Sequence, residues 1–183
     1  MSTPASFLFA VGVLSCANLG AQTFTLTSET VGGQATMDQV YNSFGCTGSN
    51  VSPQLSWKNA PEGTKSYAIT MYDKDAPTGS GWWHWVVYDI PVSVTSVHAG
   101  AGDPGKYLMP AGVVQGKTDF GTLGYGGPCP PPGAGPHQYV VTVYALKNEK
   151  LGVDANASPA VVSYNASAQS LARASIVFYY ERK

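Results

Sequence analysis

The chain has 183 residues, enough for one domain with a hydrophobic core of its own. Hydrophobic residues make up 44% of it and charged residues only 11%, and the formal net charge is -1. This composition is globular and lacks the basic stripe of nucleic-acid-binding proteins, so no nucleic-acid partner is expected. An acidic ligand would have to be held by local groups and not by the field of the whole protein.

The N-terminal stretch is typical of a secretion signal. An apolar run at residues 7–14 has the length of a signal-peptide core and is too short to span a bilayer. We expect cleavage after Ala21, with residues 1–21 as a signal peptide and residues 22–183 as one domain in the periplasm or outside the cell. Because no Lys or Arg precedes the apolar run, a partly buried N-terminal strand is the alternative, and a lipoprotein anchored through Cys16 fits the sequence poorly. No later segment reaches transmembrane length.

The chain contains three cysteines. If Cys16 leaves with the signal peptide, Cys46 and Cys129 remain, an even number in an oxidising compartment. Both lie in loops rich in Gly and Pro, where two thiols can meet without disturbing a strand ladder. We therefore predict a disulfide between Cys46 and Cys129.

The rest of the chain is dominated by short runs of β-branched and aromatic residues between Gly, Pro, Asn and Asp, which is typical of strands. Residues 159–174 differ, because Ser158 can cap a helix that has Pro159 at its first position. The sequence therefore predicts a mainly β domain with one late helix. The predicted strands are 23–27, 54–57, 67–72, 82–89, 139–146 and 175–180, and the apolar residues of the predicted helix are Val161, Val162, Tyr164, Ala168 and Leu171.

A first candidate functional residue, Asp73, ends the third predicted strand. By period-two alternation Asp73 shares a face with Ile69 and Met71. A carboxylate on an apolar face is costly unless something pairs with it. Asp75 is interpreted as a turn residue that bonds its own backbone.

A second candidate, His84, lies in the strand that follows and is flanked by tryptophans. Regular alternation places His84 on one face with Trp82 and Val86, and Trp83 and Trp85 on the other. Such a histidine is either a satisfied core residue or the polar anchor of an aromatic-walled pocket. Taken alone, the core interpretation is the stronger.

The third candidate region is the long segment 99–135, which is rich in Gly and Pro and typical of a binding loop. Consecutive prolines at 130–132 make it stiff, and its glycines permit close approach of a ligand to the backbone. It runs into a strand in which His137 and Tyr139 share a face. A rigid structural crossover is the alternative, and a PxxP peptide ligand is disfavoured because the segment continues directly into a strand.

Together, the three regions supply one carboxylate and two imidazoles. Two histidines can donate hydrogen bonds to phosphate or carboxylate oxygens, and a carboxylate can hold one imidazole in its charged form.

At these residues the chain resembles the phosphatidylethanolamine-binding protein family, in its bacterial Raf-kinase-inhibitor-like (YbhB/YbcL) branch. The family's first signature, Asp-x-Asp-Ala-Pro followed by Gly-Trp-x-His-Trp, matches residues 73–77 and 81–85. Its second, Tyr-Gly-Gly-x-x-Pro-Pro-x-Gly before His-x-Tyr, matches residues 125–133 and 137–139. The similarity runs from about Phe24 to the C-terminus.

The resemblance implies a central antiparallel β-sheet flanked by a smaller sheet, with the C-terminal helix alongside. It also implies a small cavity for phosphate, acetate or a phospholipid head group, in a protein that acts by binding, as an inhibitor of a kinase or protease target, and not by catalysis or through a cofactor or metal. The residues that would line this cavity are Asp73, Ala76, Trp82, His84, Cys129, Pro130, Pro131, His137 and Tyr139.

Two positions depart from the family pattern. Lys74 stands where the first signature usually has Pro, and we expect its side chain to point to solvent. Gln138 stands where Arg often follows the second histidine, which removes part of the charge at the rim.

The alternative to a binding protein is a small hydrolase or a metal-dependent enzyme. Asp73 with the two histidines could form a metal triad or an acid–base pair, and Cys129 near His137 could act as nucleophile and base. Against this, the chain has no HxxxH spacing, no Gly-x-Ser-x-Gly elbow and no phosphate-binding loop. The predicted disulfide would also remove the thiol.

Overall fold

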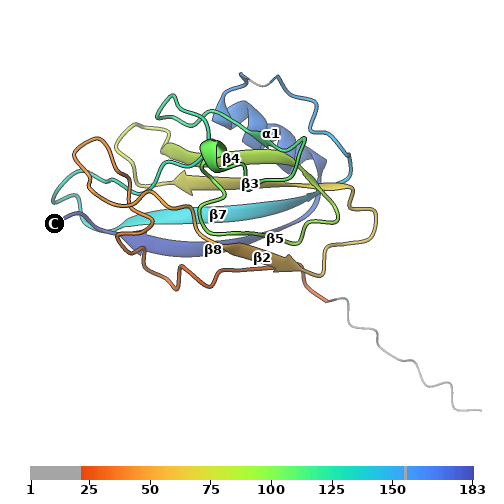
Figure 1. The fold of residues 1–183 in the computed structure, drawn as a ribbon, viewed down its shortest axis with the longest axis horizontal. Coiled ribbons are helices and arrows are strands. Elements are labelled where there is room, and N and C mark those ends of the chain that lie inside the picture. The colour runs from red at the N-terminus through yellow and green to blue at the C-terminus, as the bar shows by residue number, and fades with distance from the viewer. Residues whose placement is uncertain (1–21, 155) are drawn as a thin grey trace, which may run out of the picture.

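The computed structural model describes residues 22–154 and 156–183, and the predicted signal peptide lies outside these residues. The described chain is mainly β with one late helix, as predicted (Figure 1). The strands are β1 (Thr25–Thr27), β2 (Leu55–Lys58), β3 (Ser66–Asp73), β4 (Trp82–Pro91), β5 (Ser96–Val97), β6 (Val114–Gln115), β7 (His137–Leu146) and β8 (Ser170–Tyr180); the helix is α1 (Pro159–Gln169), and a short 3₁₀ turn covers Pro104–Lys106.

The strands form two antiparallel sheets. A large sheet has the order β6-β4-β3-β7-β8, and a small one has the order β1-β2-β5. This arrangement confirms the central sheet and smaller flanking sheet that the family resemblance implies. No helix among the described residues is long and apolar enough to cross a membrane.

The large sheet is covered on both faces. Alternate residues of β3, such as Ile69 and Met71, point into a core shared with Leu55 and Trp57 of the small sheet. Ala68, which directly precedes Ile69 in the chain, points to the opposite face, where α1 packs through Val162 and Ala166. Period-two alternation of apolar side chains therefore supplies both layers of the core.

The helix is shorter than the sequence predicts. Ser158 caps α1 by accepting a hydrogen bond from the backbone N–H of Val161, as predicted, but the helix ends at Gln169. Residues 170–174 belong to β8 instead, because pairing with β7 satisfies their backbone groups and places Ala172 and Ala174 against the main core.

The predicted apolar face of the helix is also wrong in part. Val161 and Tyr164 are exposed, whereas Val162 and Ala166 are buried against the sheet. Pro159 is buried as well, so the helix contacts the sheet through Pro159, Val162 and Ala166.

Candidate functional site

Three strand ends meet at one edge of the large sheet and form the framework of the site. Asp73 is the last residue of β3, Trp82 is the first of β4, and His137 is the first of β7. Because neighbouring strands in the order β4-β3-β7 are antiparallel, the end of the central strand lies beside the starts of the two outer ones. The register sets Asp73 opposite both Trp82 and Tyr139.

A pocket of about 190 Å³ opens at this edge. Eight of the nine residues that the sequence places in the cavity line its wall: Asp73, Ala76, Trp82, His84, Cys129, Pro130, Pro131 and His137. The ninth, Tyr139, does not line it. Its ring is fully buried behind the wall, 5.1 Å from the ring of His84 and stacked on Phe178.

Four further wall residues are not among those predicted: Phe44, Pro77, Thr78 and Phe120. Pro77 and Thr78 directly follow the Asp-x-Asp-Ala motif, so the motif itself could have indicated them. Phe120 lies in the segment 99–135, in which a binding loop was predicted without a particular residue. Phe44 has no signal in the sequence, because only the folded loops bring it to the pocket.

His84 is the extra residue of a β-bulge. Met71 pairs with Trp85 and Tyr72 pairs with Trp83, so His84 between them has no partner on β3. The predicted alternation is therefore wrong here, and Trp82 and Trp85 both lie opposite residues of the same face of β3. An extra residue turns a side chain out of the regular pleat, and the bulge thus directs His84 toward the pocket.

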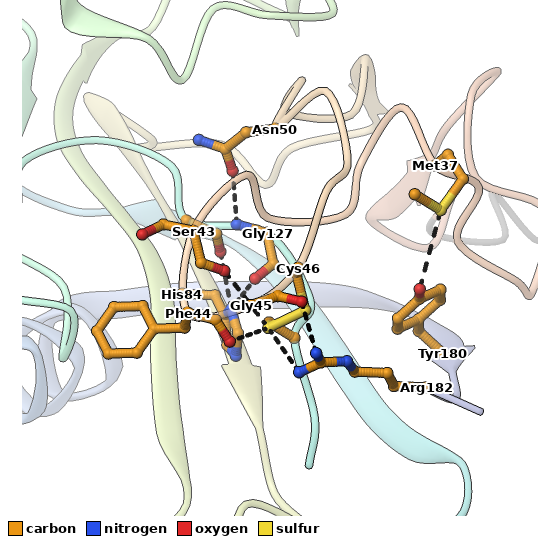
Figure 2. Close-up of a disulfide and its surroundings, with 12 residues drawn as sticks. Met37, Ser43, Phe44, Gly45, Cys46, Asn50, His84, Gly127, Tyr180 and Arg182 are labelled. Atoms are coloured by element: carbon orange, nitrogen blue, oxygen red, sulfur yellow. Dashed lines mark hydrogen bonds between the residues drawn. A yellow bond between two sulfur atoms is a disulfide. The ribbon is translucent and has the colours of Figure 1, made fainter. Parts of the chain in front are cut away.

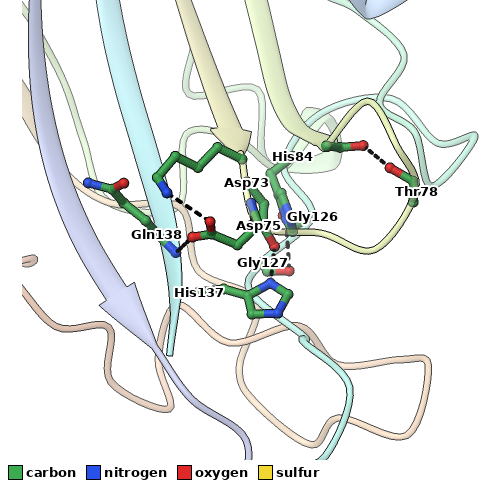
Figure 3. A network of polar contacts seen from close by, with 10 residues as sticks. Asp73, Asp75, Thr78, His84, Gly126, Gly127, His137 and Gln138 are labelled. Carbon is green, nitrogen blue, oxygen red and sulfur yellow. Dashed lines mark hydrogen bonds and ion pairs between the residues drawn. The ribbon is translucent and has the colours of Figure 1, made fainter. Parts of the chain in front are cut away.

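Two backbone carbonyls fix the orientation of the His84 ring (Figure 3). Its Nδ1 atom lies 2.7 Å from the carbonyl oxygen of Gly126 and 3.1 Å from that of Gly127. A carbonyl only accepts hydrogen bonds, so Nδ1 carries a proton. Burial lowers the pKa of His84 to about 4, and the imidazole is consequently neutral at pH 7.

The second imidazole pairs with the carboxylate. Nδ1 of His137 donates to Oδ2 of Asp73 over 2.7 Å, and Oδ1 of Asp73 accepts from the backbone N–H of Asp75. The expectation that Asp73 needs a partner on its apolar face is confirmed. The buried Tyr139 phenol has its pKa raised, because burial and then the charge of Asp73 both disfavour its ionised form.

Asp75 does not bond its own backbone as predicted. Its carboxylate accepts from the backbone N–H of Gln138 over 2.8 Å and pairs with Lys74 over 2.7 Å, which ties the Asp-Ala-Pro loop to β7 (Figure 3). The Lys74 ammonium, through its hydrogen bond, lowers the pKa of Asp75. Lys74 itself is half-exposed and does not line the pocket, in keeping with the expectation that it points to solvent.

The Gly-Gly-Pro stretch fits closely against residues 39–50. The backbone N–H of Gly126 donates to the carbonyl of His84, and that of Gly127 donates to Oδ1 of Asn50. A Cβ atom on Gly127 would lie 2.0 Å from the carbonyl oxygen of Gln39, so only glycine fits. This close packing positions the two carbonyls that hold His84.

Cys46 and Cys129 form a disulfide, as predicted (Figure 2). The bond joins the loop that carries Phe44 to the proline-rich wall of the pocket. Arg182 supports the same loop by donating to the carbonyl oxygen of Gly45. Since the thiol of Cys129 is consumed by the disulfide, it is not available as a nucleophile in this state.

The site does not assemble the metal triad of the enzyme alternative. His84 turns its Nδ1 atom to backbone carbonyls, whereas His137 turns its own to Asp73. In the described part of the chain, no three His, Cys, Asp or Glu side chains are grouped as metal ligands would be. What the site offers is a small pocket with two imidazoles, one carboxylate and the Thr78 side chain on a wall whose other residues are apolar or part of the disulfide.

The two packed β-sheets and the pocket at the strand ends define a ligand-binding β fold. The family model for phosphatidylethanolamine-binding proteins matches residues 27–181. The chain belongs to the phosphatidylethanolamine-binding protein family.

Relatives support this assignment. The chain is 50% identical over 165 residues to the UPF0098 protein YbcL of Escherichia coli, with 89% of this chain and 90% of the relative covered. It is also 50% identical to the E. coli protein YbhB over 75% of this chain and 85% of YbhB. The crystal structure of E. coli YbcL, described as a new member of the mammalian PEBP family, superposes with a TM-score of 0.84, covering 87% of this chain and 99% of YbcL. A homologue from Chlamydia trachomatis, at 26% identity, gives 0.71 over 87% of this chain and 98% of its own.

Proposed function

We propose that the protein binds a small oxyanion, such as phosphate or the phosphate of a phospholipid head group, without covalent chemistry. One observation carries the proposal: two imidazoles on the pocket wall have their Nδ1 atoms bonded within the protein and their Nε2 atoms left without a hydrogen-bond partner among the described residues. Imidazole nitrogens that face a pocket without an internal partner can form hydrogen bonds with the oxygen atoms or the O–H group of such a ligand.

The pocket's size supports a small ligand. Pockets for drug-sized molecules usually measure about 300–1,000 Å³, whereas this one measures about 190 Å³. A phosphate group fits this scale better than a whole lipid does. The exposed ring of Phe44 and the ring of Phe120 would meet the less polar part of a ligand at the wall.

We further propose that the protein works in the periplasm or outside the cell. The disulfide supports this, because such bonds persist mainly in oxidising compartments. Expression of the full chain in a bacterium tests the idea. We expect the periplasmic fraction to contain a protein that begins at Gln22, and a chain that keeps Met1 and stays in the cytoplasm would contradict it.

Binding itself is tested by titrating the protein with phosphate and with phosphoethanolamine while tryptophan fluorescence is followed. Trp82 lines the pocket, and its neighbour Trp83 packs against Tyr72 and does not line it. We expect saturable quenching that is lost in Trp82→Phe and retained in Trp83→Phe. No response to millimolar ligand at pH 5 or pH 7 would contradict the proposed function.

A further inference from the structure

The hydrogen bonds of the two pocket imidazoles limit what each can offer a ligand. In His84, Nδ1–H is used by the carbonyls of Gly126 and Gly127, so a neutral ring has only a lone pair at Nε2. A lone pair repels a phosphate oxygen. His137 differs, because its Nδ1–H points to the carboxylate of Asp73 and not to backbone carbonyls.

Among the described residues, none of those that line the pocket is Lys or Arg. Two cations close to the wall in sequence or through the disulfide have other partners: Lys74 pairs with Asp75, and Arg182 donates to the carbonyl of Gly45. Asp73 adds a carboxylate to the wall. A bare anion would therefore enter a pocket that already holds a carboxylate, and an unpaired charge in such a site is costly.

We propose that the pocket binds an oxyanion only together with one proton, which lies between an oxygen of the anion and Nε2 of His84. This inference rests on the proposed function and names its ligand class, an oxyanion that carries an acidic O–H group. A phosphomonoester in its singly ionised form brings the proton with it. A phosphodiester has no such group, so a solvent proton must be taken up on His84 when it binds.

The groups around His84 keep its ring neutral in the empty pocket, so a proton reaches Nε2 only when the ligand binds. The titratable groups that face the ring are Asp73 from β3 and His137 and Tyr139 from β7. The segment between β6 and β7 contributes the Phe120 ring, 5.3 Å away, and the two glycine carbonyls. Burial outweighs the attraction of Asp73 and keeps the pKa of His84 at about 4, so the ring is neutral in the empty pocket at pH 5 and above.

Isothermal titration calorimetry tests the inference with a matched pair of ligands, phosphoethanolamine and glycerophosphoethanolamine, which differ in being a monoester and a diester. Titrations in buffers of different ionisation enthalpy give the number of protons taken up. For the diester we expect uptake of about one proton between pH 5.5 and pH 8, and an affinity that falls about tenfold for each unit of increasing pH.

The monoester should behave differently because its second ionisation lies near pH 6. At pH 5 it should bind with almost no proton uptake, and its affinity should begin to fall only above about pH 6. Binding of the diester without proton uptake would overturn the inference and leave the proposed function intact. If neither ligand bound at pH 5, the proposed function itself would fail and the inference with it.

Two variants locate the proton. In His84→Gln the side-chain amide can donate without taking up a proton, so uptake should drop by about one and the pH dependence of the affinity should flatten. His137→Gln is the control. Because it leaves His84 in place, diester binding to this variant should still take up about one proton. An unchanged proton uptake in His84→Gln would overturn the assignment of the proton to His84. If that variant does not fold, the difference in proton uptake between the two ligands on the wild-type protein still tests the inference.

Discussion

Nδ1 of His137 lies 2.7 Å from Oδ2 of Asp73, and both side chains are 4% exposed. Removing the carboxylate by Asp73→Ala leaves a buried imidazole without its acceptor, so we expect a loss of about 3 kcal/mol of unfolding free energy. Asp73→Asn keeps an oxygen that can accept from Nδ1 and should lose less than half of that. Urea denaturation at pH 7 measures both variants, and equal losses would mean that the hydrogen bond does not stabilise the fold.

The buried His84 makes stability fall in acid. Its pKa is lowered from 6.5 to about 4 by burial, so the unfolded chain binds a proton at this position more readily than the folded chain does. The unfolding free energy should therefore decrease as the pH drops from about 6.5 to 4, by up to about 3 kcal/mol for this residue.

Urea denaturation between pH 4 and pH 7, in buffers without phosphate, gives this dependence. The comparison with His84→Gln isolates it from the carboxylates that titrate in the same range. We expect the variant to show a slope that is smaller by nearly one proton, and parallel curves for the two proteins would contradict the burial of a neutral ring.

The disulfide should contribute substantially to stability because it closes a long loop. Its cysteines are 83 residues apart in sequence, for which loop-closure entropy gives about 4 to 5 kcal/mol. We expect the double variant Cys46→Ser, Cys129→Ser to unfold at a lower urea concentration and to bind phosphate more weakly, since the bond positions the Phe44 loop on the pocket.

Reduction by dithiothreitol should reproduce the loss of stability in the wild type and leave the double variant unchanged. Alkylation of the unreduced protein provides a direct check. Labelling of both Cys46 and Cys129 before reduction would show that the bond had not formed.

The fit of Gly127 against Gln39 predicts a strong effect from a single methyl group. A Cβ at this position would lie 2.0 Å from a backbone oxygen, so Gly127→Ala must move the chain that carries the carbonyls facing His84. We expect a loss of about 2–3 kcal/mol and weaker phosphate binding.

Gly32→Ala is the matched control, because a Cβ there meets nothing within 4 Å. Thermal unfolding followed by circular dichroism compares the two variants. A Gly127→Ala protein as stable as Gly32→Ala would show that the loop adapts without cost.

Much of the fold follows from local patterns in the sequence. The shared face of Ile69 and Met71 in β3 and the cap at Ser158 were both predicted from their residues and are found in the structure. The end of the helix was not, because residues 170–174 become a strand only by pairing with β7, a long-range contact that no local pattern contains.

In the site, too, local motifs predicted some residues, and residues placed by long-range contacts were missed. Motif resemblance indicated eight wall residues, but it placed Tyr139 on the wall although that ring lies behind His84. Phe44 reaches the wall through a loop whose position depends on the disulfide and on Arg182, contacts between residues far apart in sequence. Such contacts depend on the assembled structure, and spacing along the chain does not reveal them.

The bulge in β4 assigns strand pairing and ligand binding to different residues: Trp83 and Trp85 pair with β3, whereas His84 lines the pocket. His84 is surplus to the pairing of β4 with β3, so a chain shortened by this one residue could pair Trp83 and Trp85 in an unbroken ladder with the same core. Such a chain would keep the pairing of β3 with β4 and lose the histidine of the pocket. The pocket histidine therefore depends on the length of this short stretch, whereas the core depends only on the residues that flank it.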